Sequence, residues 1–396
     1  MTPSRPTILQ LIPRLDTGGA EQATIDITAA LVKAGARALV ATEGGRLAGK
    51  ITKRGGEIAE LPLSSKNPAT ILINSRRIAS LCQGEGVNLI HARSRAPAWS
   101  GLMAARQLKL PFVTTYHGAY GGKSAIKTWY NGVMARGDVV IANSQFTARL
   151  IAERHHTPAE RIVVVPRGID LARFDPGAVS PDRIKALRAH WGVAPERPIV
   201  LNAARLTGWK GQRVLIEAAG LLVRDGRLGN AVVVLAGDAQ GRDGYAEELR
   251  SLTGSLGLGG QVVLGGHCAD MPAAFAAASV CVVASTEPEA FGRVAAESLA
   301  MGTPVVATNT GAPPETLSPA AGEPQLGWLA PPGDAPALAN AIAQVLALPE
   351  LALDQLAIAA RNHVARHFSL EVMQRQTLAV YDRLLGTKLA EIPRNA

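Results

Sequence analysis

The chain has 396 residues, enough for two or three domains at the roughly 150 residues typical of one domain. Apolar residues make up 47% and charged residues 18% of the sequence, and the 40 glycines and 25 prolines are spread along the chain. This composition excludes a disordered protein and a collagen-like fibre. The three cysteines, Cys82, Cys268 and Cys281, are too few and too scattered for a disulfide framework or a zinc cluster, which favours reduced thiols and a cytoplasmic location.

The formal net charge of +9 is concentrated in the first half of the chain. Residues 1–175 contain 23 Lys and Arg against 12 Asp and Glu, whereas residues 176–396 contain 18 against 20. A basic half indicates an anionic partner, such as nucleic acid, a phospholipid surface or an acidic substrate. The alternative explanation is the arginine usage of a GC-rich genome.

Two apolar stretches are candidates for targeting or membrane segments. The first, Thr7 to Pro13, is shorter than the apolar core of a secretory signal and has no small-residue cleavage site. The longest, Met271 to Ala284, is interpreted as a helix followed by a strand. Because neither reaches the ~18 residues of a membrane span, we expect a soluble or peripheral protein.

Short apolar runs alternate with amphipathic segments along both halves, which predicts parallel sheets covered by helices on both faces. In the first half we expect strands at Thr7–Ile12, Ala38–Ala41, Ile58–Leu61, Leu89–His91, Phe112–Thr115, Val139–Ala142 and Ile162–Val165. In the second half we expect them at Ile199–Ala203, Ala231–Ala236, Val262–Leu264, Val280–Ala284 and Pro304–Ala307.

The alternation predicts an α/β fold of two Rossmann-like, doubly wound domains that face a central cleft, with ligands at the carboxyl ends of the strands. The segment PRGIDLARFDP, at 166–176, interrupts the alternation and is expected to link the domains. The first domain is then 1–170 and the second 177–371. The last helix, roughly Leu370–Leu385, follows the second sheet and is free to cross back, so we assign about 372–396 to the first domain.

Two carboxylates lie where a strand of the second domain gives way to a helix. Glu289 is on the loop after Val280–Ala284, and Glu297 lies inside the helix that Gly292 opens. Carboxylates so spaced can bind vicinal hydroxyls, one pair on a sugar and one on a ribose. The helix start supplies backbone N–H groups for phosphate oxygens, from Phe291, Gly292 and Arg293. In the purely structural alternative, Glu289 favours the helix dipole and Glu297 is solvated.

This segment resembles the E-x7-E signature of the retaining glycosyltransferases with the GT-B fold, specifically family 4. The matching residues are Glu289-Ala290-Phe291-Gly292, then Glu297, then Ala300-Met301-Gly302-Thr303-Pro304-Val305-Val306-Ala307. The sequence departs from the family at Ala290, where glycine is common. The resemblance implies that Glu289 to Arg293 and Glu297 bind the donor nucleotide sugar.

Two basic and two glycine residues extend the resemblance over nearly the whole chain. In Ala203–Gly211, Arg205 and Lys210 resemble the family's pair that neutralises the nucleotide diphosphate, although isolated charges of this kind are often only solvated. Fixed cations there would stabilise the charge that the diphosphate gains as it leaves. Gly18 and Gly19, between the first strand and the first helix, resemble the family's glycine loop at the donor, where a tight turn is the alternative.

Further candidates follow strands of the first domain. The resemblance places His117 beside the reacting sugar, although a lone histidine is often a satisfied core residue. It implies a role for Asn143 and Ser144 in the acceptor pocket, unless Asn143 only caps the next helix. Arg93 and Arg95 are candidates for acidic groups of the acceptor, or else surface arginines. In the second domain, the strand-end residues expected near the nucleotide base are Gly237, Asp238 and His267.

The segment Lys123–Arg136 has the pattern of an interfacial anchor. Its apolar residues recur at helical spacing, at Ile126, Trp129, Tyr130, Val133 and Met134, and its flanking basic residues are Lys123, Lys127 and Arg136. Together with the positive charge of the same domain, this pattern favours binding to the anionic inner face of the cytoplasmic membrane. The alternative is a helix packed on its own sheet with a polar rim.

We therefore predict a retaining, metal-independent glycosyltransferase with no cofactor, which uses a UDP-, GDP- or ADP-sugar and a saccharide or lipid-linked acceptor. The expected catalytic residues are His117, Arg205, Lys210 and Glu289. The enzyme is expected to resemble bacterial transferases that build lipopolysaccharide core or other envelope glycans.

Three alternatives are a GT-B-fold nucleotide-sugar epimerase, a dinucleotide-binding oxidoreductase and a nucleic-acid-binding module. Gly18-Gly19 lacks the G-x-G-x-x-G spacing of the oxidoreductases. The basic residues are dispersed and not clustered with aromatic residues, which argues against nucleic acid.

Overall fold

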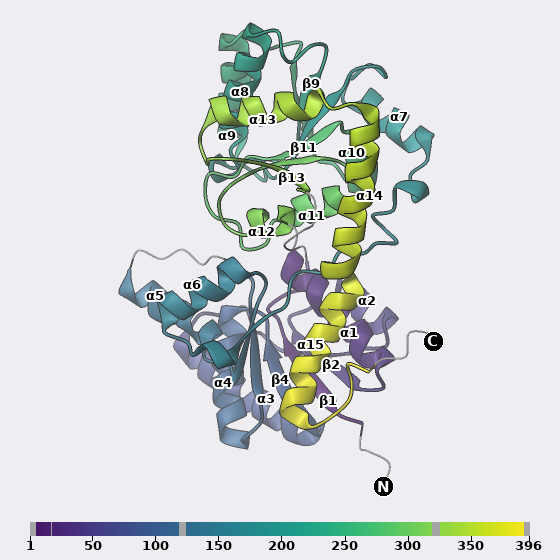
Figure 1. Ribbon diagram of the computed structural model, residues 1–396. Helices are drawn as coiled ribbons and strands as arrows, with labels where there is room; N and C mark the ends of the chain where they lie inside the picture. Colours follow the sequence, from purple (N-terminus) through teal and green to yellow (C-terminus); the bar gives the residue numbers. More distant parts are fainter. Residues whose placement is uncertain (1–4, 17, 119–123, 319–324, 392–396) are drawn as a thin grey trace. The chain divides into compact units, whose positions relative to one another are not determined.

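The computed structural model describes residues 5–16, 18–118, 124–318 and 325–391 (Figure 1). The chain divides into two compact units, one of Met1–Gly168 with Leu370–Ala396 and one of Ile169–Ser369. We call these the N-terminal unit and the C-terminal unit. The division between Gly168 and Ile169 falls inside the segment PRGIDLARFDP.

The N-terminal unit is built on a parallel seven-stranded sheet with the order β3-β2-β1-β4-β5-β6-β7. The strands are β1 (Thr7–Leu11), β2 (Arg37–Thr42), β3 (Glu57–Glu60), β4 (Val87–Ala92), β5 (Phe112–Tyr116), β6 (Val139–Ala142) and β7 (Ile162–Val164). The helices are α1 (Gly19–Lys33), α2 (Ala48–Lys53), α3 (Pro68–Gly84), α4 (Arg95–Leu108), α5 (Ala125–Asn131), α6 (Gln145–His155) and α15 (Leu370–Leu385), with 3₁₀ turns η1 (Gly132–Ala135) and η2 (Ala159–Arg161). All seven strands expected here are confirmed.

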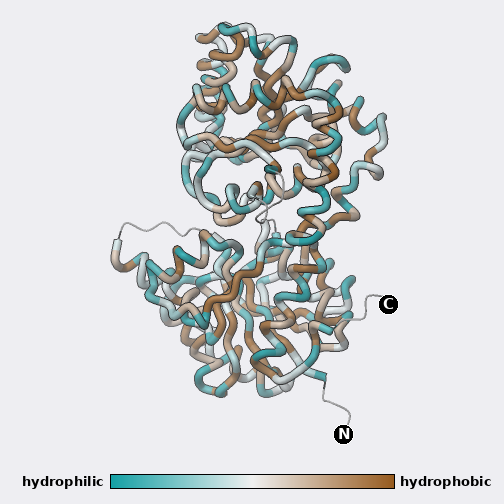
Figure 2. The backbone as a smooth tube through the Cα atoms, viewed as in Figure 1, coloured by the Kyte–Doolittle hydropathy of each residue, from teal (hydrophilic) through white to brown (hydrophobic). Residues whose placement is uncertain are grey.

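The central strands of this sheet are mostly apolar (Figure 2), because helices cover both of its faces, whereas the edge strand β3 has the sequence EIAE. On one face, Leu9 and Ile90 pack with residues of α3, α4 and α6. On the other face, Ile8 and Leu89 pack with residues of α1 and α15. Neighbouring residues of one strand therefore enter opposite cores, as the period of two requires.

The C-terminal unit has a parallel six-stranded sheet with the order β10-β9-β8-β11-β12-β13. The strands are β8 (Ile199–Ala203), β9 (Val232–Ala236), β10 (Val262–Gly266), β11 (Val280–Val283), β12 (Val305–Thr308) and β13 (Gly327–Ala330). The helices are α7 (Pro181–His190), α8 (Gln212–Arg224), α9 (Asp243–Ser255), α10 (Met271–Ala277), α11 (Arg293–Ala300), α12 (Pro313–Leu317), α13 (Ala335–Leu346) and α14 (Glu350–His367), with 3₁₀ turns η3 (Pro176–Ala178) and η4 (Gly208–Lys210).

One hydrophobic core covers each face of this second sheet. Residues of α8, α9 and α13 pack on one face, and residues of α7, α10, α11 and α14 pack on the other. Five of the six strands were expected, and β13 was missed because it is a four-residue edge strand that begins with glycine. The predicted α/β architecture of two Rossmann-like units is confirmed.

Helix α15 returns to the N-terminal unit, as predicted, and a buried polar contact holds it there. Met373, Leu378 and Tyr381 join the core beside β1 and β4. The Tyr381 hydroxyl lies 2.6 Å from Nδ1 of His91, whose Nε2 lies 2.7 Å from the Thr115 hydroxyl. Each nitrogen of this buried imidazole therefore has one partner, and one of the two partners comes from the end of the chain.

Tyr381→Phe should lower the free energy of unfolding by about 1–3 kcal/mol, because it leaves Nδ1 of His91 buried without a partner. Urea unfolding followed by circular dichroism measures the change. Tyr245→Phe is the matched control, since it removes the same atom from a half-buried site where the hydrogen bond to Gln212 is 3.4 Å long. Equal stability of the two variants would contradict the proposed anchoring.

Candidate active site

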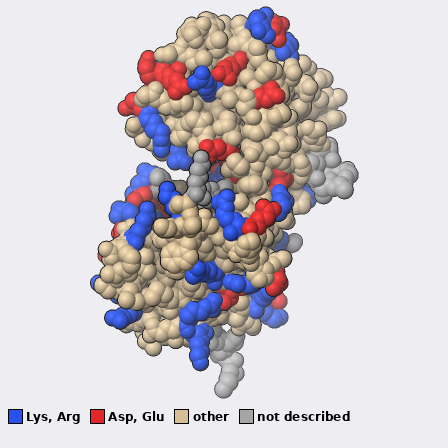
Figure 3. Space-filling model, turned by 90° about the vertical axis from the view of Figure 1, so that its left-hand side faces the viewer, with Lys and Arg blue, Asp and Glu red and all other residues tan. Residues whose placement is uncertain are grey.

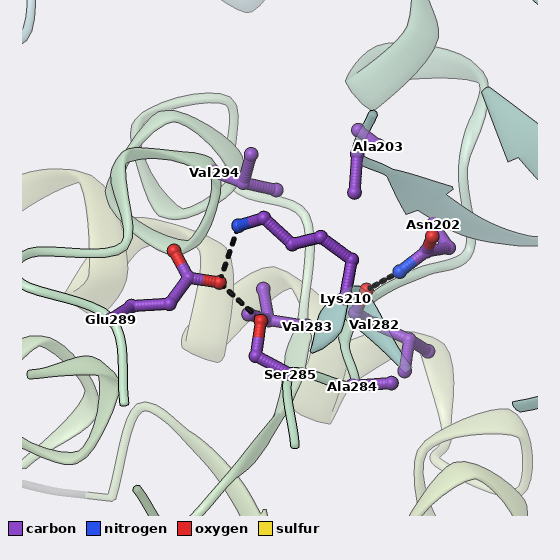
Figure 4. A pocket seen from close by; sticks show the side chains of 10 residues that line it. Asn202, Ala203, Lys210, Val282, Val283, Ala284, Ser285, Glu289 and Val294 are labelled. Atoms are coloured by element: carbon purple, nitrogen blue, oxygen red, sulfur yellow. Dashed lines mark hydrogen bonds and ion pairs between the residues drawn. The ribbon is translucent and has the colours of Figure 1, made fainter. Parts of the chain in front are cut away.

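The carboxyl edge of the C-terminal sheet carries a small pocket with a partly buried ion pair among its lining residues (Figure 4). Nζ of Lys210 lies 2.7 Å from Oε1 of Glu289, and the Ser285 hydroxyl donates to the same oxygen. Both charged side chains are largely shielded, with 15% and 11% of their surfaces exposed. The pocket is lined by Asn202, Ala203, Ala204, Lys210, Val282, Val283, Ala284, Ser285, Glu289 and Val294.

Two glycines allow the loops of this pocket to come together. Gly211, at φ 71°, lies so close to β11 that a Cβ there would stand 1.8 Å from the Ala284 carbonyl oxygen. A Cβ at Gly311, which has φ 74°, would stand 2.4 Å from the backbone nitrogen and oxygen of Glu289. Because these two glycines lie against neighbouring backbone, they fix the backbone positions from which the side chains of Lys210 and Glu289 extend.

The other residues expected at the nucleotide lie along the same edge. Arg205 is exposed after β8, with Nη1 3.5 Å from Oε1 of Gln240. Asp238 follows β9, is exposed, and accepts from the backbone N–H of Gln240 at 2.9 Å. Gly237 and His267 follow β9 and β10. The structure therefore brings the predicted strand-end residues of this unit to one edge, while their contacts with a nucleotide stay predictions.

The helix of the E-x7-E segment begins where the sequence predicts. Gly292, at φ 76°, caps α11, and Ala290 and Phe291 precede it. Glu297 is only 8% exposed, so the alternative of a solvated face residue is wrong. Burial raises the pKa of its carboxyl group, while Arg293, 2.7 Å from Oε1, opposes the rise. Glu297 is therefore a buried carboxylate held by one arginine.

Two pocket residues were missed from the sequence. Asn202 is the polar residue inside the apolar strand β8; its Nδ2 donates to the Val282 carbonyl at 2.8 Å, and its Oδ1 is buried without a partner among the described residues. Ser285 directly follows the expected strand Val280–Ala284. A lone polar residue at the end of an apolar strand was the available signal for both.

In the N-terminal unit, parallel strands bring Gly18, Gly19, Arg93 and His117 to one edge of the sheet. Thr17 of the glycine loop lies outside the described residues. Arg167, after β7, donates to the Gly19 carbonyl. Burial, and then the positive charges of Arg167 and Arg93, lower the pKa of His117 well below 6.5, so the imidazole is neutral at pH 7.

The expected acceptor residues are less exposed than the sequence indicated. Arg93 is 3% exposed, so the alternative of a surface arginine is wrong for it, and its Nε donates to Gln10 at 2.8 Å. Arg95 is half-buried, with Nη1 2.9 Å from Oδ1 of Asn131. Asn143 and Ser144 are buried, and Ser144 caps α6 by accepting from the backbone of Thr147. Contact of these four with an acceptor stays a prediction.

The expected interfacial helix is shorter than predicted. Helix α5 ends at Asn131 and continues as the 3₁₀ turn η1, which changes the spacing and turns Val133 and Met134 into the core, so their placement on the anchor face is wrong. Ile126 and Trp129 are exposed, at 79% and 59%, whereas Lys123 lies outside the described residues.

The residues of the predicted anchor that stay at the surface form an aromatic and basic patch, which we call the ledge. It consists of Ile126, Lys127, Trp129 and Arg136, with Trp99 packed against it. Trp129 lies against Trp99 with 4.6 Å between ring centroids, and the guanidinium of Arg136 lies 5.0 Å from the Trp99 ring. Nε1 of Trp99 donates to the carbonyl of Tyr130, and Lys127 is exposed. Among the described helices, none alone is long and apolar enough to cross a membrane, although α13 and α14, bent by 106°, satisfy both conditions together.

In the part of the chain that the structure describes, no three His, Cys, Asp or Glu side chains are grouped so that they could hold a metal ion.

Comparison with known proteins identifies the family. Residues 17–173 match the family described as Glycosyltransferase Family 4, and residues 183–363 match that described as Glycosyl transferases group 1. The crystal structure of a glycosyltransferase from Rickettsia africae is similar over 97% of this chain and 100% of its own, with a TM-score of 0.87 and 32% identity. The chain belongs to the glycosyltransferases. The oxidoreductase and nucleic-acid alternatives are therefore wrong.

Other relatives of this glycosyltransferase carry more specific names. The Anabaena protein HepE, in a crystal structure with UDP and glucose, has a TM-score of 0.79 at 27% identity over 95% of this chain and 99% of its own. A GDP-mannose-dependent alpha-(1-6)-phosphatidylinositol monomannoside mannosyltransferase of Mycolicibacterium smegmatis is 28% identical over 83% of this chain and 82% of its own. A D-inositol 3-phosphate glycosyltransferase of Xylanimonas cellulosilytica is 30% identical, and the chain spans little more than half of it, 56%.

The glycosyltransferase should lose stability as the pH falls below about 6.5, the ordinary pKa of histidine. The folded-state pKa values of His91 and His117 lie below that of the unfolded chain, so the unfolded state binds more protons in this range. The decrease in the free energy of unfolding should approach about 1.4 kcal/mol per pH unit for each imidazole. Urea unfolding at pH 7.5, 6.5 and 5.5 measures it. His117→Gln should reduce the slope, and an unchanged slope would contradict a neutral buried imidazole.

Proposed function

We propose that this enzyme is a retaining, metal-independent glycosyltransferase that moves a sugar from a nucleotide-sugar donor to a saccharide or lipid-linked acceptor. The observation that carries the proposal is the ion pair of Lys210 and Glu289, with Ser285, at the carboxyl edge of the C-terminal sheet. It combines a fixed cation for a phosphate with a carboxylate for sugar hydroxyls. A UDP-, GDP- or ADP-sugar is the co-substrate, and no further cofactor takes part.

Lys210 keeps donors for a phosphate while it holds Glu289. An ammonium group has three N–H donors, and the contact with Oε1 of Glu289 uses one of them. The exposed Arg205 adds a planar guanidinium at the same edge. Together these two side chains can balance the charge that the diphosphate gains as the bond to the sugar breaks.

The two carboxylates have separate roles in the donor site. Glu289, with one oxygen held by Lys210 and Ser285, is positioned to accept from hydroxyls of the donor sugar. Glu297, buried one helix turn beyond Arg293, accepts from the hydroxyls of the ribose. The N-terminus of α11 adds N–H donors for the diphosphate.

We assign His117 to binding the donor sugar and not to proton transfer. Its pKa lies well below 6.5, so at neutral pH the imidazole can both donate and accept a hydrogen bond. In a retaining transfer the departing phosphate takes the proton of the acceptor hydroxyl on the same face. His117 then orients the sugar and need not act as a general base.

Relatives support this donor and acceptor chemistry. HepE has been crystallised with UDP and glucose, and the mycobacterial relative is named as a GDP-mannose-dependent phosphatidylinositol monomannoside mannosyltransferase. The basic N-terminal half suits an acidic or membrane-bound acceptor, and we place the reaction in lipopolysaccharide or other envelope-glycan synthesis. A GT-B-fold epimerase would need the same donor and no acceptor, so sugar transfer distinguishes the two.

Arg205→Ala and Lys210→Ala should each lower kcat by about 10²–10³, the usual effect of losing one electrostatic stabiliser of a transition state. Donor turnover, coupled to release of the nucleoside diphosphate, measures the change, and activity should persist in EDTA. Arg224→Ala, which removes an exposed cation of the same unit at the end of α8, is the control. Loss of activity in EDTA that Mn²⁺ or Mg²⁺ restores would assign the charge balance to a metal.

We also propose that the N-terminal unit docks on an anionic membrane through the ledge at α5. Its exposed apolar residues, Ile126 and Trp129, stand beside Lys127 and Arg136. Figure 3 shows Lys and Arg spread over the visible face of this unit with few acidic residues between them. An apolar edge with basic neighbours is the pattern of an interfacial anchor.

Lys127→Gln with Arg136→Gln should weaken binding to vesicles of anionic phospholipid at low salt by about fivefold for each charge removed. Ile126→Ser with Trp129→Ser should weaken it further, and added salt should reduce binding by the parent. Co-sedimentation with the vesicles measures the change. Lys50→Gln with Arg54→Gln, on α2 and the loop after it, makes the same charge change and should bind like the parent. Equal binding by all variants would assign α5 a purely structural role.

A further inference from the structure

His117 presents two buried polar atoms that the described protein residues leave unsatisfied. Neither Nδ1 nor Nε2 has a hydrogen-bond partner among them, and both atoms are shielded from solvent. Buried polar groups without partners cost folding free energy and are rare in native proteins. The side chain follows β5 at the carboxyl edge of a parallel sheet, where ligands of such sheets bind. A ligand is therefore the natural partner of this ring.

The electrostatic surroundings of His117 are positive. Arg167, Arg93 and His91, in that order, are the charged or titratable neighbours that lower its pKa after burial. The guanidinium of Arg167 lies against Gly19, where a Cβ would stand 3.2 Å from Nη1, and the side chain is partly exposed. Arg93 lies deeper, and its Nη2 is buried without a partner among the described residues.

Two carboxylates partly compensate the positive charge of these arginines. Asp26 acts on Arg93 and accepts from Nε2 of Gln22 at 2.7 Å. Glu21 feels the charge of Arg167, and its carboxylate lies against Gly18. Neither Asp26 nor Glu21 contributes to the shift at His117, where the charged neighbours that act are both cations. A ligand at the imidazole thus meets a positive field.

We propose that His117 and Arg167, with the charge of Arg93 beneath them, bind an acidic group, a carboxylate or a phosphate, of the acceptor sugar. The inference rests on the proposed function, because it takes the N-terminal unit to hold the acceptor. The half-exposed Arg167 can meet the anion with a two-pronged guanidinium contact. The neutral imidazole, one donor and one acceptor, matches a hydroxyl next to the acidic group. Arg93 favours the anion through its charge.

The test measures binding of sugars that differ only in the acidic group. Glucose 6-phosphate and glucuronic acid are compared with glucose by isothermal titration, in the presence and absence of UDP and at constant ionic strength. The parent should bind both acidic sugars at least about tenfold more tightly than glucose, the effect of one charge-assisted hydrogen bond. Inorganic phosphate alone is the control for non-specific anion binding.

Arg167→Gln should remove most of this preference, and Arg167→Lys should keep part of it. Arg54→Gln, an exposed residue of the same unit, makes the same charge change and should keep the preference in full. Arg93→Lys keeps the deeper cation and should therefore keep the preference, because the proposal uses only the charge of this residue. Thermal unfolding of each variant shows whether it is folded, and UDP affinity reports separately on the C-terminal unit.

Three outcomes overturn the inference. Equal binding of glucose and the acidic sugars by the parent would show that no acidic group is recognised. If inorganic phosphate binds as tightly as glucose 6-phosphate, the sugar is not recognised and the site holds an adventitious ion only. An Arg167→Gln variant that loses UDP affinity but not the preference would assign this charge to the donor diphosphate. Absence of any nucleotide binding by the parent would instead contradict the proposed function, and leaves the comparison of the sugars intact.

Discussion

Both sheets are parallel throughout, and this single constraint decides where the chemistry of the protein lies. Every strand of a unit ends at the same edge, so residues far apart in sequence become neighbours without any further interaction. In the C-terminal unit the constraint unites Lys210, which follows β8, with Glu289, which follows β11. In the N-terminal unit it unites His117 with Arg93 and Arg167. The price is that both faces of each sheet must be covered by helices.

The same constraint explains how much the sequence could predict. Strands buried on both faces are short continuous apolar runs, so all strands except β13 could be located, and residues at their ends could be named as site candidates. Glu289 and Lys210 were both predicted at the donor, but the contact between them depends on the close backbone approach at Gly211. No periodicity in the sequence encodes an approach of that kind.

Long-range partners within the N-terminal unit were also beyond the sequence. Tyr381 meets His91 across 290 positions, and nothing in either local segment indicates the other. Val133 and Met134 fit a helical stripe with Ile126, yet the change to a 3₁₀ turn at Gly132 buries them. A stripe of apolar residues predicts one buried or membrane-facing side, but tertiary packing decides which.

The excess positive charge of the first half therefore has two physically different parts. Lys127 and Arg136 are exposed, so salt screens them and their effect on a partner is graded. Arg93 is buried where screening is weak, and its desolvation is tolerated because Gln10, Tyr381 and Asp26 surround it. A buried cation of this kind adds nothing to diffuse attraction and instead sets the potential at one point, the neutral ring of His117. The exposed charges suit a surface, whereas the buried one suits a small ligand with a defined anionic group.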